Sequence, residues 1–150
     1  MLVLVILFGS WMILRGIGLL GVAALATWRD TARYALAVMF VFTGISHFTK
    51  IRHDMARMIP SVFPRKMFIV YVTGVFEISG ALGLLIPRFR SVSGVCLTLL
   101  LIAMFCANVN AALNNVTLLG KPPTPLWLRT PMQIMFIALI WWVSNPQPGS

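Results

Sequence analysis

The sequence predicts an all-α integral membrane protein, and three observations carry this prediction. Of the 150 residues, 59% are hydrophobic and only 10% are charged, whereas soluble domains usually carry about 25% charged residues. The mean hydropathy is +0.92. The apolar residues form long stretches, most of them near the roughly 20 residues that a helix needs to cross a bilayer. This composition excludes a disordered chain and is not that of a soluble globular domain.

Five apolar stretches are the expected membrane helices. The first contains Arg15, a charge that must reach the interface, face a wet cavity or pair within the bundle. This stretch is too long for a plain secretory signal and has no clear cleavage site after it. We therefore expect five helices, or four helices with a loosely attached first one. The stretches cover about residues 1–28, 31–49, 67–86, 91–113 and 131–145.

The last stretch has the local pattern of a helix start. Thr130 is suited to the N-cap, Pro131 to the first helical position, and Gln133 completes a capping box. A helix over 131–145 is about 22 Å long, which is shorter than the roughly 30 Å hydrocarbon core. Either this helix is tilted and only partly immersed, or the preceding loop dips inward and carries Arg129 below the headgroups.

Basic residues lie in short runs between the apolar stretches. The formal net charge is +9, from 12 Lys and Arg against 3 Asp and Glu. This arrangement is typical of loops facing anionic headgroups, so the expected partner is the lipid bilayer and not nucleic acid. Loops 50–66 and 114–130 together carry seven basic residues and the opposite loops carry four, which favours a cytoplasmic position for 50–66 and 114–130. Cys96 and Cys106 form no CxxC, and the sequence predicts no metal site and no evident cofactor.

Glu77 is the strongest candidate for a functional residue. It lies about ten residues from either end of the third stretch, near the bilayer centre, where a carboxylate costs several kcal/mol unless it is protonated or paired. Gly74, Gly80 and Gly83 stand at steps of three from it. Such a stripe lets another helix approach closely, so Glu77 is expected to face the bundle interior.

His47, near the end of the second stretch, is the expected partner of Glu77 in a catalytic acid–base pair. The two residues are expected to differ by about 10 Å in depth, so a direct contact would need a tilted helix or a water. The alternative is structural: Glu77 hydrogen-bonds two helices together, and His47 is an interfacial residue bonded to a carbonyl group.

A second group of polar residues lies where the fourth stretch ends and the fifth begins. Asn108, Asn110, Arg129 and Gln133 are the expected ligand-binding residues, with Arg129 as an anchor for an anionic ligand or an ion-pair partner of Glu77. The alternatives are interhelical hydrogen bonds for the asparagines and a headgroup contact for Arg129.

Several short motifs occur in a recognisable order. They are GISHF at 44–48, Ile59-Pro60, Phe63-Pro64, GVFE at 74–77 with the following glycines, the turn at 87–90, ANVN at 107–110 and WLRTPMQ at 127–133. In order and spacing, and over roughly three quarters of the chain, they resemble the DoxX-like family of small membrane proteins. The resemblance implies a DoxX-like four-helix bundle over 29–145, with an additional N-terminal transmembrane helix over 1–28. Residues 146–150 are expected to form a short tail. It also implies association with membrane oxidoreductases, including quinone-linked ones.

Three functions are compatible with these features. The first is an accessory or assembly subunit that packs against another membrane protein or a second copy, since the sequence holds no complete catalytic set. The second is a small enzyme or binder of a lipid-like molecule, such as a quinone, sterol-like or isoprenoid compound, with Glu77 as acid or base. The third is a transporter, which the lack of an inverted repeat disfavours.

Overall fold

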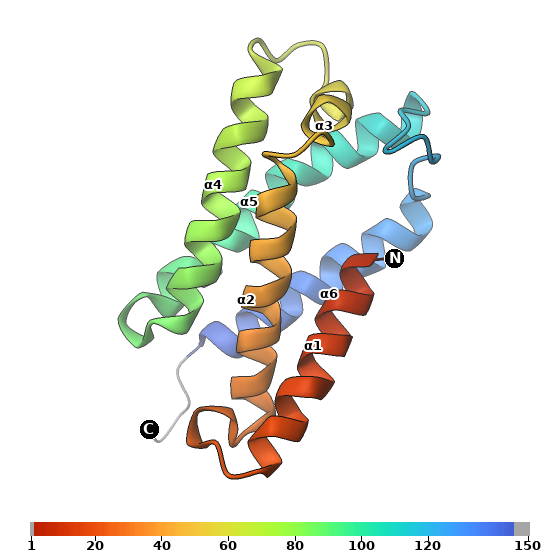
Figure 1. Cartoon of the computed structure of the whole chain (residues 1–150). Helices are drawn as coiled ribbons and strands as arrows, with labels where there is room; N and C mark the ends of the chain where they lie inside the picture. Colours follow the sequence, from red (N-terminus) through yellow and green to blue (C-terminus); the bar gives the residue numbers. More distant parts are fainter. Residues whose placement is uncertain (1, 146–150) are drawn as a thin grey trace.

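The computed structural model describes residues 2–145, and the expected tail over 146–150 lies outside the described part. All regular elements in that part are helices, apart from one isolated β-bridge between Leu118 and Lys121. The prediction of an all-α chain is therefore confirmed. Figure 1 shows the helices α1 (Leu2–Leu19), η1 (Ala23–Leu25), α2 (Trp28–Ser46), α3 (Arg52–Met58), α4 (Lys66–Leu85), η2 (Pro87–Phe89), α5 (Arg90–Leu113) and α6 (Leu126–Ser144).

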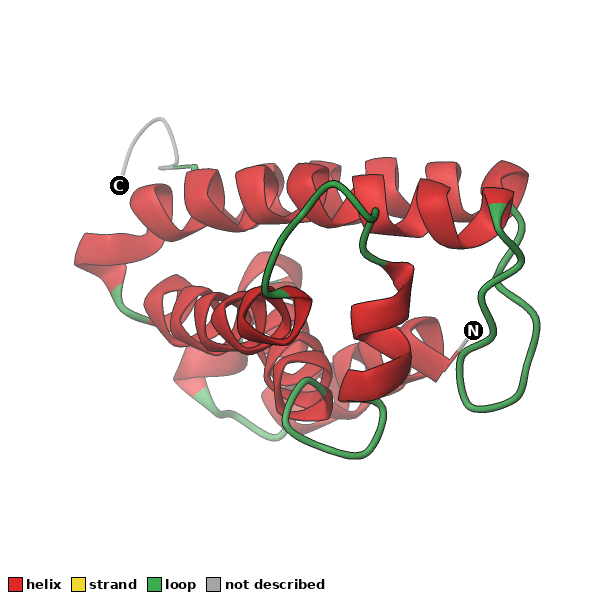
Figure 2. Ribbon diagram, turned by 90° about the horizontal axis from the view of Figure 1, so that it is seen from above, coloured by secondary structure: helices red, strands yellow, loops and turns green. Residues whose placement is uncertain are grey.

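Helix α2 lies at the centre of the bundle. It packs against α1, α4 and α6, and its side chains Leu36, Met39 and Phe40 are almost completely buried. Seen from above, α5 and α6 form one layer and α1, α2 and α4 form the other (Figure 2). Thr27 is the N-cap of α2, because its hydroxyl accepts a hydrogen bond from the Asp30 N–H at 3.0 Å.

Helix α1 is firmly attached to α2. The Trp11 indole donates a hydrogen bond to Thr31 Oγ1 at 3.0 Å, and Leu7 is completely buried in the common core. Arg15 pairs within the chain: its guanidinium donates to the Ala26 carbonyl at 2.8 Å and lies 5.0 Å from the centre of the Trp28 ring. Of the alternatives open for Arg15, the structure therefore shows internal pairing.

Glycines on α4 set its distance from α5. A Cβ at Gly80 would lie 2.6 Å from the Leu97 side chain, and a Cβ at Gly83 would collide with Ser93. Because neither glycine has a side chain, the two helices approach closely at these positions. Part of the predicted glycine stripe thus serves the contact between α4 and α5.

Helix α6 begins earlier than the sequence predicts. It starts at Leu126 after the N-cap Pro125, and Pro131 lies inside the helix. The predicted start at Thr130 is wrong because the turn before Pro131 has its own hydrogen bonds, from the Leu128 and Arg129 N–H groups to the Pro125 carbonyl. With 19 residues, α6 is about 28 Å long. It is therefore close to the roughly 30 Å thickness of the hydrocarbon core, and the expected difference in length is not found.

Four helical segments are long and apolar enough to cross a membrane: Leu2–Leu19, Lys66–Leu85, Pro87–Leu113 and Leu126–Ser144. These four support a multi-pass membrane protein. Helix α2, the second of the five expected spans, is outside this set. Its first two turns carry three charged residues, Arg29, Asp30 and Arg33, which lowers its hydropathy below that of the other long helices.

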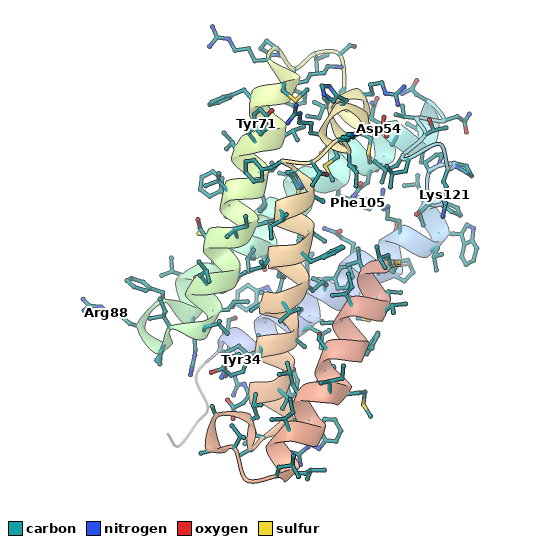
Figure 3. All side chains as sticks on the ribbon, viewed as in Figure 1. Tyr34, Asp54, Tyr71, Arg88, Phe105 and Lys121 are labelled. Carbon is teal, nitrogen blue, oxygen red and sulfur yellow. The ribbon has the colours of Figure 1, made fainter. Side chains whose placement is uncertain are left out.

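The loops that precede α4 and α6 meet at one end of the bundle. Asp54 on α3 accepts a hydrogen bond from the Leu119 N–H at 2.9 Å and pairs with Arg57. The Asn110 amide donates to the Met58 carbonyl at 2.8 Å. Figure 3 shows Asp54 and Lys121 close together at this end. Loops 50–66 and 114–130 thus lie on the same side of the bundle.

The Asp54 contact is expected to be lost in acid. The Leu119 N–H and the Arg57 guanidinium hold the pKa of Asp54 below its ordinary value of 3.8. A lowered folded pKa means that the contact is fully present above 3.8 and is lost as the pH falls through the lower folded value. At neutral pH, Asp54→Asn removes the anionic acceptor, and we expect faster amide hydrogen exchange over residues 117–121. Unchanged exchange in this variant would show that the loop does not depend on Asp54.

Candidate functional site

The candidate site lies where α2 and α4 cross at two glycines. A Cβ at Gly74 would lie 2.6 Å from His47 Cβ and 3.1 Å from the Gly44 carbonyl oxygen. A Cβ at Gly44 would lie 3.1 Å from the Gly74 carbonyl oxygen and 3.3 Å from Glu77 Cβ. The two backbones are therefore nearly in contact, and the polar residue three positions after each glycine is brought to the crossing.

His47 is the C-cap of α2, so its position depends on where that helix ends. Helix α2 ends beside Gly74, about two turns from the start of α4 at Lys66. His47 lies beside Gly74, and Glu77 is three positions after Gly74 on α4. The levels of His47 and Glu77 therefore differ by about one helical turn. The expected difference of about 10 Å in depth is wrong, since it assumed that α2 and α4 reach the same level.

Glu77 and His47 are in direct contact. Glu77 Oε2 lies 3.1 Å from His47 Nε2, and the two side chains are each only 4% exposed. The other carboxylate oxygen, Oε1, accepts a hydrogen bond from the Thr43 hydroxyl at 3.0 Å. Glu77 therefore faces the bundle interior, as the sequence predicts, and both of its oxygens are next to polar atoms of α2.

One proton is required between Glu77 and His47. His47 Nδ1 lies 2.9 Å from the Val70 carbonyl oxygen, which only accepts hydrogen bonds, so we assign a proton to Nδ1. The Thr73 hydroxyl lies 3.1 Å from the same nitrogen. With Nδ1 protonated, Nε2 of neutral histidine is an acceptor, and it cannot face an ionised carboxylate without a proton between them. The pair is either imidazolium with carboxylate or imidazole with carboxylic acid.

The geometry of the Glu77–His47 contact is not that of a fully formed hydrogen bond. Glu77 Oε2 is buried and has no well-aligned donor among the described residues, although Nε2 is 3.1 Å away. A buried carboxylate oxygen without a well-aligned donor costs free energy. The site therefore combines a carboxylate–threonine hydrogen bond with a less well-aligned carboxylate–imidazole contact.

Aromatic side chains cover the site toward the α3 end of the bundle. The Phe48 and Tyr71 rings stack with centres 5.7 Å apart, and the Arg52 guanidinium lies 5.9 Å from the centre of the Tyr71 ring. Figure 3 labels Tyr71 near the α3 end of α4. The pair is thus enclosed by side chains of its own chain.

The predicted ligand-binding residues form a separate group. Arg129 Nη1 donates to Asn108 Oδ1 at 2.7 Å, which links α6 to α5. Asn110 holds the end of α3, as described above. Gln133 Nε2 is buried and has no hydrogen-bond partner among residues 2–145. The expected ion pair between Arg129 and Glu77 is wrong, because Arg129 pairs with Asn108 and Glu77 contacts His47 and Thr43.

Thr73 and the Val70 carbonyl were missed by the sequence analysis, and so was the role of Gly44. A signal for the crossing does exist in the sequence. Gly44 precedes His47 by three residues, and Gly74 precedes Glu77 by the same number. Two helices that each carry glycine one turn before a polar residue are suited to a close crossing that pairs those residues. No such signal identifies a backbone carbonyl as the partner of Nδ1.

Among residues 2–145, His, Cys, Asp and Glu side chains form no group of three or more that could hold a metal ion. Cys96 and Cys106 are free and exposed.

Comparison with known proteins corrects the expected family. Neither curated proteins nor solved structures include a match to this chain. A protein-family model matches residues 36–144, from α2 to the end of α6, and this range contains both crossing glycines with His47 and Glu77. The family is not the DoxX-like one, so the DoxX-like bundle and the redox partners inferred from that resemblance lose their support. The chain belongs to the family described as a domain of unknown function, DUF8561.

Proposed function

We propose that this chain is an integral, multi-pass accessory or assembly subunit of a membrane complex. The observation that carries the proposal is the closure of its central polar site. Glu77 and His47 engage each other, Thr43 binds the second carboxylate oxygen, and the two side chains are 4% exposed. Buried polar groups that contact each other within one chain hold the helices that carry them in a defined packing. In this proposal the pair sets the crossing of α2 and α4.

The outer face of α1 supplies a surface for a partner helix. One row of its exposed residues has alternating steps of three and four, the spacing found in the seam of a helix pair. Gly9 and Gly16 stand seven residues apart in this seam, and a Cβ at either would meet nothing within 4 Å. Close approach of a second helix is therefore open along this face. The seam consists of Leu2, Val5, Gly9, Met12, Gly16 and Leu19.

Filling the α1 seam with larger side chains is expected to remove the partner protein from the complex. In native nanodiscs, the wild-type chain is expected to carry another membrane protein in stoichiometric amount, measured by quantitative mass spectrometry. Gly9→Leu with Gly16→Leu fills the seam and is expected to reduce that partner at least tenfold. The matched control is Ala103→Leu with Ala138→Leu, which enlarges small exposed residues on α5 and α6.

Two outcomes would contradict the accessory-subunit proposal. One is a wild-type chain that carries no protein in stoichiometric amount. The other is an equal loss of partner in the seam variant and in the control, because the seam would then have no special role. A complex that contains only this chain would identify a homo-oligomer instead.

A second candidate function is acid–base chemistry on a lipid-like molecule, such as a quinone, sterol-like or isoprenoid compound. It is favoured by the imperfect donor to Glu77 Oε2 and by the single proton of the pair. It predicts a small molecule enriched over bulk lipid in wild-type nanodiscs and lost in Glu77→Gln, which keeps the shape but not the acid. Equal small-molecule content in the two proteins would exclude this function.

A further inference from the structure

Three arginines gather at the end of the bundle where α2 and α5 begin. Arg29 and Arg33 belong to the first two turns of α2, and Arg90 is the first residue of α5. The end of α6 brings them together, because Ser91, the residue after Arg90, donates to the Ser144 carbonyl at 3.4 Å, while Arg33 and Arg29 donate to the carbonyl groups on either side of it. Asp30 pairs with Arg33 at 2.7 Å. Three guanidinium groups thus accompany one carboxylate, which leaves an excess of two positive charges.

Part of this charge has a structural use. Arg33 donates to the Val143 carbonyl at 3.3 Å, and Arg29 donates to the Asn145 carbonyl, so both stabilise the C-terminal end of α6. The Nε atoms of Arg29 and Arg90, however, are buried and have no hydrogen-bond partner among residues 2–145. Buried donors without an acceptor are costly. Arg52 Nε is in the same position at the opposite end of the molecule, so what distinguishes this end is the excess of positive charge beside an apolar groove.

An apolar groove begins beside the arginines. It lies between α2 and α4, has a volume of about 380 Å³ and is lined on α2 from Tyr34 to Ile45 and on α4 by Leu82 and Leu85. Its α2 wall is about 16 Å long. Tyr34 connects the two features, because it lines the groove and directly follows Arg33 on α2. Figure 3 shows Tyr34 beside α2, near the turn that joins α4 to α5.

We propose that this end of the molecule binds an anionic phospholipid, with the phosphate at Arg90 and Arg29 and an acyl chain along the groove. A guanidinium group binds phosphate through two parallel N–H donors of the same side chain, and Arg29 and Arg90 supply two such groups at one end of the bundle. The groove offers an apolar chain a surface continuous with the phosphate-binding donors. A free anion would use only the arginines, and a neutral lipid would use only the groove.

The test compares lipid retention in four single variants of the full chain. Each protein is purified in detergent and exposed to equal amounts of phosphatidylglycerol and phosphatidylcholine, and the lipid that remains after washing is measured by native mass spectrometry. Arg90→Gln removes the phosphate contact, and its matched control Arg88→Gln removes the same charge from an exposed side chain that points away from the bundle (Figure 3). Val38→Trp fills the groove, and its control Leu99→Trp alters an exposed position on α5.

The proposal predicts that the wild type retains phosphatidylglycerol at least tenfold over phosphatidylcholine. We expect Arg90→Gln and Val38→Trp each to lower this retention at least fivefold, with no change in either control and unchanged helical content by circular dichroism. Equal retention of the two lipids by the wild type would overturn the proposal. If Arg88→Gln lost as much phosphatidylglycerol retention as Arg90→Gln, the proposal would be overturned as well. If inorganic phosphate displaced the bound phosphatidylglycerol and Val38→Trp had no effect on its retention, the site would bind a free anion and not a phospholipid.

Discussion

Replacing Glu77 by leucine is expected to lower the free energy of unfolding by about 3 kcal/mol. The substitution leaves His47 Nε2 and the Thr43 hydroxyl facing an apolar side chain at a site that is almost fully buried. Removing one member of a buried hydrogen-bonded pair costs more than the pair itself contributes, because the remaining member keeps its desolvation penalty. The measurement is equilibrium unfolding in mixed micelles with a denaturing detergent.

Glu77→Gln is the informative comparison. A glutamine amide donates to neutral His47 Nε2, and its oxygen accepts from Thr43, so both contacts of Glu77 persist. We expect Glu77→Gln to stay within about 1 kcal/mol of the wild type. In the double variant Glu77→Leu with His47→Leu, part of the stability is expected to return, because no unpaired polar group is left at that contact. Equal losses in Glu77→Leu and Glu77→Gln would show that the two hydrogen bonds are not what stabilises the crossing.

Replacing Gly74 by alanine is expected to be nearly as harmful, although it adds only one methyl group. The new Cβ would lie 2.6 Å from His47 Cβ and 3.1 Å from a backbone oxygen of α2, so one helix must move. Overpacking of this kind costs about 1–3 kcal/mol. The same displacement separates His47 from Glu77. Gly74→Ala and Glu77→Leu together are therefore expected to cost less than the sum of the two single effects.

Gly16→Ala is the matched control for Gly74→Ala. It adds the same methyl group to a glycine in a helix, but a Cβ at this position meets nothing within 4 Å. Alanine has the higher helix propensity, so this variant is expected to be neutral or slightly stabilised. If Gly16→Ala and Gly74→Ala unfold at the same denaturant concentration, the close crossing is not the cause of the loss. Both proteins are measured in the same micelles as the Glu77 variants.

The helical class and the inward position of Glu77 could be predicted because both follow from local features. Hydropathy determines the class, and a carboxyl group flanked by glycines must face another helix. The matching glycines before His47 and Glu77 indicate that the two helices can cross closely, but they do not give the level of the crossing along the bundle. That level depends on α2 ending beside the third turn of α4, which no residue within 44–48 specifies.

The start of α6 shows how a correct local rule gives a wrong boundary. Threonine before proline is a good helix start, yet the preceding turn is also helical and is linked to α5 by the Arg129–Asn108 contact. Tertiary contacts therefore extend the helix beyond its best capping pattern. The resemblance to another family failed for a related reason. Short motifs of glycine, proline and single polar residues recur wherever membrane helices pack closely.

The arginines of α2 tie the start of the central helix to a part of the chain that is far away in sequence. Arg33 donates to a carbonyl group 110 residues further along, at the end of α6. A buried donor without an acceptor costs free energy, and before α6 packs in place Arg33 has only Asp30 as a partner. The first turns of α2 are therefore expected to become fully ordered together with the end of α6, and not in the order in which the two helices occur in the chain.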